Sequence, residues 1–169
     1  MAARRVGIDW DGLERALTRR SRESEAFLDT RTGDIIWVTR GWSDDHGFAD
    51  PDLDEGLAAR RLLPVLPVPP ETEQGWMREF AASLEDGWPR DALLAALESP
   101  APDLRFEAAL GFFPEDRVRW VACRDARLAA VLRAWLEASE VEPSNPPPRR
   151  YASLLGNGEP AGQRGSAVS

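Results

Sequence analysis

The sequence predicts an α+β protein, with a small antiparallel β-hairpin or three-stranded sheet packed on a mainly helical C-terminal half. Three observations predict this class. The best strand signal lies within residues 25–39, the segments between residues 71 and 140 have helical periodicity, and the strands precede the helices instead of alternating with them. A chain of 169 residues suits one domain, which we place at residues 1–141, followed by a disordered tail at residues 142–169.

The N-terminal elements are predicted to be a short helix and a hairpin. Residues 9–20 suit a helix, because Asp9 or Asp11 can accept hydrogen bonds from its first backbone N–H groups and its apolar residues share one face. Residues 25–39 suit a hairpin, because a turn at Thr32-Gly33-Asp34 is followed by a run of β-forming residues.

A polar, acidic connection is expected at residues 40–61, followed by a proline-punctuated segment at residues 62–70 (LLPVLPVPP). Proline has no backbone N–H to donate to a β-ladder. Residues 62–70 are therefore predicted to form an edge strand or an extended stretch that completes a small sheet.

The C-terminal half is predicted to contain four helices, at about residues 71–85, 89–98, 102–112 and 115–140. Short connections that contain glycine or proline imply antiparallel packing of neighbouring helices. The last helix is the longest and carries a stripe with alternating spacings of three and four residues, formed by Val118, Val121, Asp125, Leu128, Leu132 and Trp135.

Asp125 interrupts this otherwise apolar stripe. A buried carboxylate must be paired or hydrogen-bonded, or its pKa rises. We therefore predict a buried ion pair between Asp125 and an arginine from a neighbouring turn or helix. The candidate partners are Arg78, Arg105 and Arg119.

Composition excludes several kinds of chemistry. All 21 basic residues are arginine, so no lysine can form a Schiff base or hold a phosphate in a glycine-rich loop. One cysteine and one histidine exclude a disulfide framework and a cysteine-built zinc site. No membrane-spanning run and no cofactor-binding motif is apparent, so we expect neither a membrane nor a cofactor as a ligand.

The net charge of −8 disfavours nucleic acid as a partner, because an acidic surface repels a phosphate backbone. An alternative hypothesis is that nucleic acid binds to arginines on one face of the last helix, although acidic residues alternate with these arginines. Those arginines are Arg117, Arg119, Arg124 and Arg127.

The candidate interaction surface combines an acidic loop with tryptophans near loops. Seven tryptophans are many for this length, and exposed tryptophan is enriched at binding hot spots. The predicted surface consists of Trp42, Asp44, Asp45, His46 and Trp88. The alternative hypothesis is a metal-dependent hydrolase or nuclease that uses the acidic residues of the loop at 44–55, with His46 as a nitrogen donor or general base.

Several segments resemble the bacterial Uncharacterised Protein Family 0158. They are the hairpin FLDTRTGDIIWV, the segment LLPVLPVPP, a helix with Trp76, Met77 and Phe80, and RWVACRDARLAAVLRAWLEASEVEP near the end. The resemblance covers roughly residues 8–143. The chain departs from the family pattern at Cys123, where an aromatic residue is expected, and in its acidic loop at 41–56, which is longer than usual. The resemblance implies a cytoplasmic bacterial protein and supplies no activity or catalytic residues.

These observations favour a soluble, non-catalytic protein-interaction or regulatory module over an enzyme. Its partner would be a protein that the sequence does not identify, and an arginine-rich or otherwise basic surface would suit the acidic loop.

Overall fold

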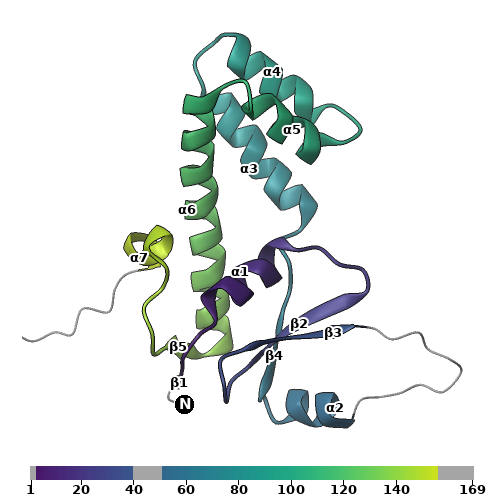
Figure 1. Ribbon diagram of the computed structural model, residues 1–169, viewed down its shortest axis with the longest axis vertical. Helices are drawn as coiled ribbons and strands as arrows, with labels where there is room; N and C mark the ends of the chain where they lie inside the picture. Colours follow the sequence, from purple (N-terminus) through teal and green to yellow (C-terminus); the bar gives the residue numbers. More distant parts are fainter. Residues whose placement is uncertain (1–2, 40–50, 156–169) are drawn as a thin grey trace, which may run out of the picture.

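The computed structural model describes residues 3–39 and 51–155 (Figure 1). The predicted α+β class is confirmed: a small sheet lies at one end of the molecule and a group of helices at the other. One long helix, α6 (Pro114–Ser139), runs between the two ends and packs on elements of both.

The sheet has three antiparallel strands, which confirms the three-stranded alternative of the prediction, and their order is β3-β2-β4. The hairpin strands β2 (Ser24–Asp29) and β3 (Ile35–Thr39) are joined by the predicted turn, and β4 (Leu62–Val65) is an edge strand. Pro64 therefore needs no N–H partner on its open side. A helix, α2 (Pro51–Ala58), precedes β4 within the segment that was expected to be only a connection.

Helix α1 (Trp10–Thr18) is capped as predicted, because the N–H of Gly12 donates to Oδ1 of Asp9 at 3.0 Å. The hairpin turn packs directly against the chain before this helix. Gly33 has a φ of +82°, and a β-carbon there would lie 1.5 Å from the carbonyl oxygen of Gly7. Only glycine therefore fits this turn.

Asp29, at the end of β2, is 3% exposed. It connects the hairpin turn, through Arg31, with the residue that precedes β4, Arg61. Its Oδ2 accepts hydrogen bonds from Nε (3.2 Å) and Nη2 (3.0 Å) of Arg61, and its Oδ1 accepts one from the backbone N–H of Arg31 at 2.8 Å. Burial by itself would raise the pKa of this carboxyl. The hydrogen bonds and charges of the two arginines outweigh it and hold the pKa below its ordinary value.

We expect Asp29→Asn to destabilise the protein by about 1–3 kcal/mol at neutral pH, the range for hydrogen bonds to charged groups. The folded pKa of Asp29 lies below the unfolded one. The ionised carboxylate therefore stabilises the fold above the unfolded pKa, and this contribution is lost as the pH falls through the folded pKa. Urea unfolding of both proteins at neutral and acidic pH measures the difference. A difference that does not shrink in acid would contradict this account.

The four predicted helices are confirmed, with bounds that differ by at most two residues from those expected. They are α3 (Pro70–Ser83), α4 (Trp88–Leu97), α5 (Pro102–Leu110) and α6. Each has a proline in its first turn, where the missing N–H costs no helical hydrogen bond. The core of this end is aromatic: the ring of Trp120 lies 5.4 Å from that of Phe80 and 5.2 Å from that of Phe106.

The apolar stripe of α6 is buried along only half of its length. Leu128 and Leu132 are 1% exposed, because α1, α7 and the sheet region surround the C-terminal half of α6. Val118 and Val121 lie on the same face but are exposed. The stripe therefore belongs to the core only in its C-terminal part.

The structure also differs from the expectation that the tail begins at residue 142. Strand β5 (Val141–Pro143) pairs in parallel with β1 (Arg4–Val6), and helix α7 (Arg149–Leu155) packs beside α6. Residues 141–155 are held by buried contacts, including those of Val141 and Tyr151. The proline-rich composition of the segment gives no sign of these contacts. Residues 156–169 of the expected tail lie outside the described residues.

Asn145 fixes the connection between β5 and α7. Its Oδ1 accepts a hydrogen bond from the N–H of Ile8 at 2.7 Å, and its Nδ2 donates to the carbonyl of Ile8 at 2.9 Å. The side chain of Asn145 thus forms the two backbone hydrogen bonds that a neighbouring strand would otherwise form with Ile8, shortly after β1. Among the described residues, no helix is long and apolar enough to cross a membrane.

Candidate functional site

Trp88 is the member of the predicted interaction surface that the structure describes. Its side chain stands at the start of α4 and is 71% exposed. Trp42, Asp44, Asp45 and His46 lie outside the described residues, so the structure does not place them beside Trp88.

Trp88 belongs to a group of aromatic residues at the surface, which we call the aromatic end and define as Trp88, Phe112 and Phe113. The rings of Trp88 and Phe113 meet edge to face, with centroids 5.1 Å apart and an angle of 83° between their planes. Phe112, in the turn between α5 and α6, is 76% exposed, whereas Phe113 is half-buried. The edge contact holds the indole on one side and leaves most of it to solvent.

The surroundings of Trp88 are acidic. Glu85 and Asp86 precede it in an exposed connection, and Asp91 lies in the first turn of α4. Arg90 pairs with Asp86 one turn away and neutralises one of these charges. The aromatic end therefore has a polar rim with a net negative charge, which is typical of the edge of a binding surface.

The metal hypothesis concerns residues that are mostly outside the described part of the chain. Of the acidic loop at 44–55, the structure describes the side chains of Asp54 and Glu55, which are exposed on α2. Within residues 3–39 and 51–155, no three His, Cys, Asp or Glu side chains are grouped so as to hold a metal ion.

Asp125 lies where α1, α6 and α7 meet, and it is half-buried. Burial raises the pKa of its carboxyl, and the negative charge of Glu14 on α1 raises it further. The positive charges of Arg150 and Arg124 oppose these effects only in part. In the described part of the chain, no arginine forms an ion pair with Asp125, so the predicted buried ion pair is not formed there.

The arginines near Asp125 are committed to other carboxylates. Arg150 pairs with Glu14 and, at 3.5 Å, with Asp11. Arg124 lies 3.4 Å from Glu73. Of the partners expected from the sequence, Arg78 pairs with Glu98 and Arg119 with Asp116.

Glu73 is an ionic centre that the sequence patterns did not reveal. The residue is 8% exposed, and its two carboxylate oxygens lie 2.5 Å from Nη2 of Arg20 and 3.4 Å from Nη2 of Arg124. Arg20 also reaches Asp103 on α5, at 3.1 Å. The group ties the end of α1 to three helices of the other end of the molecule. A signal was present, because Glu73 lies one turn before the buried Trp76 and Met77 of α3.

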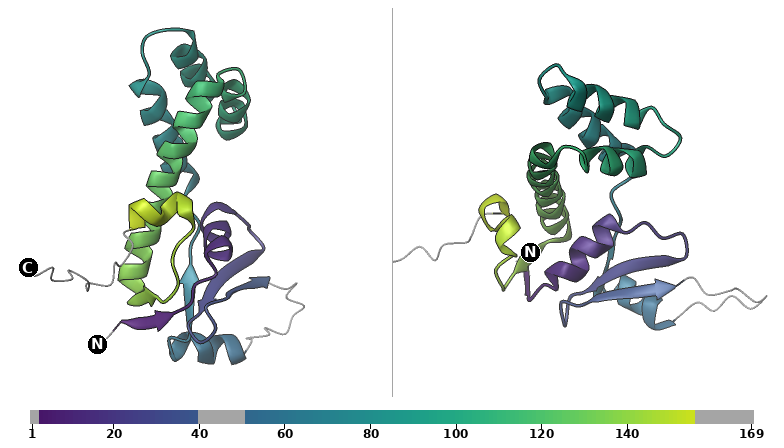
Figure 2. Two further views of the ribbon diagram at one scale, coloured as in Figure 1. Left: turned by 60° about the vertical axis from the view of Figure 1, so that its left-hand side comes forward. Right: turned by 45° about the horizontal axis from the view of Figure 1, so that its top comes forward.

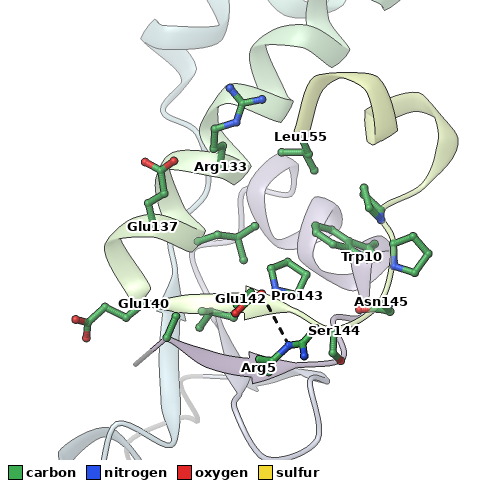
Figure 3. Close-up of a pocket in the computed structure, with 15 residues that line it drawn as sticks. Arg5, Trp10, Arg133, Glu137, Glu140, Glu142, Pro143, Ser144, Asn145 and Leu155 are labelled. Atoms are coloured by element: carbon green, nitrogen blue, oxygen red, sulfur yellow. Dashed lines mark ion pairs between the residues drawn. The ribbon is translucent and has the colours of Figure 1, made fainter. Parts of the chain in front are cut away.

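A groove of about 850 Å³ lies between the end of α6, the two-stranded β1–β5 ladder and the proline-rich connection to α7 (Figure 3). Its apolar walls include Trp10, Leu136 and Leu155. Figure 3 shows Arg133, Glu137 and Glu140 projecting away from it, whereas the Arg5–Glu142 ion pair, at 3.8 Å, crosses its floor. The groove therefore combines apolar walls with one ion pair at its floor.

Comparison with known proteins adds no assignment. No family model matches this chain, nor does any curated protein or solved structure. The resemblance to Uncharacterised Protein Family 0158 therefore stays a prediction, and the function must be inferred from the residues of the chain itself.

The described residues present two kinds of candidate site. The ionic group around Glu73 connects helices, an arrangement that positions secondary structure, and Asp125 is only half-buried beside it on α6. The aromatic end is exposed, apolar and rimmed by charge, an arrangement that suits contact with another macromolecule.

Proposed function

We propose that this chain is a non-catalytic protein-interaction module, and that the aromatic end is part of its binding surface. The observation that carries the proposal is the exposure of Trp88, which is 71% accessible although its ring is oriented by Phe113. A rigid, exposed tryptophan loses little conformational entropy on binding and can bury a large area in a partner's pocket.

The charge around Trp88 supports a particular kind of partner. Glu85, Asp86 and Asp91 outnumber Arg90 at this place, and the whole chain has a net charge of −8. A protein with an apolar pocket bordered by arginine or lysine would be complementary in both shape and charge. We further propose that the module is cytoplasmic and bacterial, as the family resemblance implies.

The test compares Trp88→Ala with Leu66→Ala in affinity purification from cells of the encoding organism. Both side chains are more than 70% exposed, and Leu66 lies in the connection after β4. We expect Trp88→Ala to lower the recovery of a specific partner by about tenfold or more, the loss typical of a hot-spot residue. Leu66→Ala should leave that recovery unchanged.

Thermal unfolding of both variants separates binding from folding. Each should remain within about 1 kcal/mol of the wild type, because neither side chain belongs to the buried core. Recovery of the same proteins, in the same amounts, by Trp88→Ala and wild type would contradict the proposal.

A further inference from the structure

The exposed half of the α6 stripe has the pattern of a helix–helix contact that nothing in the described chain covers. Val118 is 71% exposed and Val121 is 50% exposed. They continue the alternating three- and four-residue spacing of Asp125, Leu128 and Leu132. This spacing keeps one face of a helix turned toward a neighbouring helix. In Figure 1, α7 lies beside the C-terminal half of α6, and no other element follows it along that side.

Two opposite charges border the exposed valines, four residues to either side of Val121. Arg117 lies one turn before Val121, and Asp125 lies one turn after it. Within residues 3–39 and 51–155, neither Arg117 nor Asp125 forms an ion pair. The charges of Arg150 and Arg124 act on Asp125 from nearby, but both arginines pair with other carboxylates and the charge of Glu14 opposes them. A further cation beside Asp125 would therefore be favourable.

We propose that two copies of this chain associate through the exposed stripe, by an antiparallel and two-fold symmetric pairing of their α6 helices centred near Val121. The symmetry places residue 117 of each copy opposite residue 125 of the other. Each Arg117 then meets the Asp125 of the second copy, and the two Val121 side chains meet at the axis. Each Val118 lies at the level of residue 124 of the other copy.

A second copy fits this face because the face is complementary to itself. A symmetric contact presents the same patch twice, so it needs apolar residues near the axis and opposite charges at equal distances from the axis. Val121, Arg117 and Asp125 have this arrangement. A single charged position within an apolar helix seam also fixes the register and direction of pairing.

The antiparallel direction also suits the position of α7. This helix lies against the C-terminal half of α6 in Figures 1 and 2. Parallel pairing of the two α6 helices would bring both α7 helices to the same level. Antiparallel pairing moves them to opposite ends of the contact and leaves the two Val121 side chains free to meet. The exposed apolar part of the stripe consists of only two valines, so we expect a reversible dimer in the micromolar range.

Sedimentation velocity of the full chain across the micromolar range tests the proposal. The wild type should be a reversible dimer. Arg117→Asp and Asp125→Arg should each raise the dissociation constant by about 100-fold, because like charges then face each other at two places. An equimolar mixture of these two variants should dimerise again. In the mixed dimer, the new carboxylate at position 117 of one copy faces the new guanidinium at position 125 of the other, and the second pair keeps its wild-type residues.

Arg133→Asp is the matched control, because it makes the same charge change on α6 away from the exposed stripe and should leave the dimer intact. Val118→Asp is a second disruptive variant at an exposed position, so it tests the stripe even if Asp125→Arg disturbs folding. Thermal unfolding verifies that each variant is folded. A wild type that is monomeric throughout, a dimer insensitive to the stripe variants, or a mixture that stays monomeric would each overturn the proposal.

Discussion

Glu73→Ala is expected to destabilise the protein by about 3 kcal/mol, a typical cost of removing one member of a buried ion pair. The Glu73 carboxylate is almost completely buried and lies between the guanidinium groups of Arg20 and Arg124. Without it, two cations about one-third exposed remain close together with no carboxylate between them. The loss should be felt by both ends of the molecule, because Arg20 follows α1 while Arg124 belongs to α6.

Glu79→Ala is the matched control for Glu73→Ala. Glu79 lies on the same helix and also pairs with an arginine of α6, Arg127, but its side chain is 61% exposed. A solvent-exposed pair contributes about 0–1 kcal/mol, so this variant should unfold close to the wild type. Urea unfolding of the three proteins gives the comparison. Equal losses for the two variants would show that burial of Glu73 has no particular importance.

The positions of the helices and strands were predictable because their signals are local. Prolines mark the starts of α3 to α6, Asp9 caps α1, and Gly33 occupies a turn that admits no side chain. Each of these effects depends on a few neighbouring residues and on backbone geometry. The order of strands and helices then restricts the fold to one class.

The neighbours of each face were not predictable in the same way. Periodicity showed that Val118, Val121 and Leu128 share a face, but it does not say how far along α6 other elements extend. The same limit applies to Trp88, whose contact with Phe113 joins the starts of α4 and α6. The ion-pair partners of Glu73 come from residues about 50 positions away, so they become visible only in three dimensions.

Composition was misleading between residues 142 and 155. Prolines and serines there are typical of a disordered tail, yet the segment contributes Tyr151, whose side chain is completely buried. One aromatic ring and one asparagine that bonds to Ile8 hold the segment in place, together with the pairing of β5 with β1 and the ion pairs of Arg150. The average composition of a segment does not reveal the effect of two such residues.

Tyr151→Ala is therefore expected to destabilise the protein by about 3–5 kcal/mol, the usual cost of replacing a large buried aromatic residue with alanine. The ring fills a space among α1, α6 and α7 and belongs to the same core as Leu128 and Leu132. Burial and the nearby charge of Glu14 raise the pKa of the hydroxyl, so it stays protonated at neutral pH. Tyr151→Phe should remain within about 1 kcal/mol of the wild type, because it keeps the ring.

Ser153→Ala completes the Tyr151 experiment, since Ser153 is an exposed residue of the same helix and should be neutral. Hydrogen exchange measured along α7 adds a local observable: Tyr151→Ala should increase exchange there, whereas Ser153→Ala should not. The prediction would fail if the two alanine variants were equally stable, because the segment after β5 would then contribute nothing to the fold. If Tyr151→Ala alone is destabilised, the folded domain extends through α7, and the same helix limits how much of α6 remains free for a second copy.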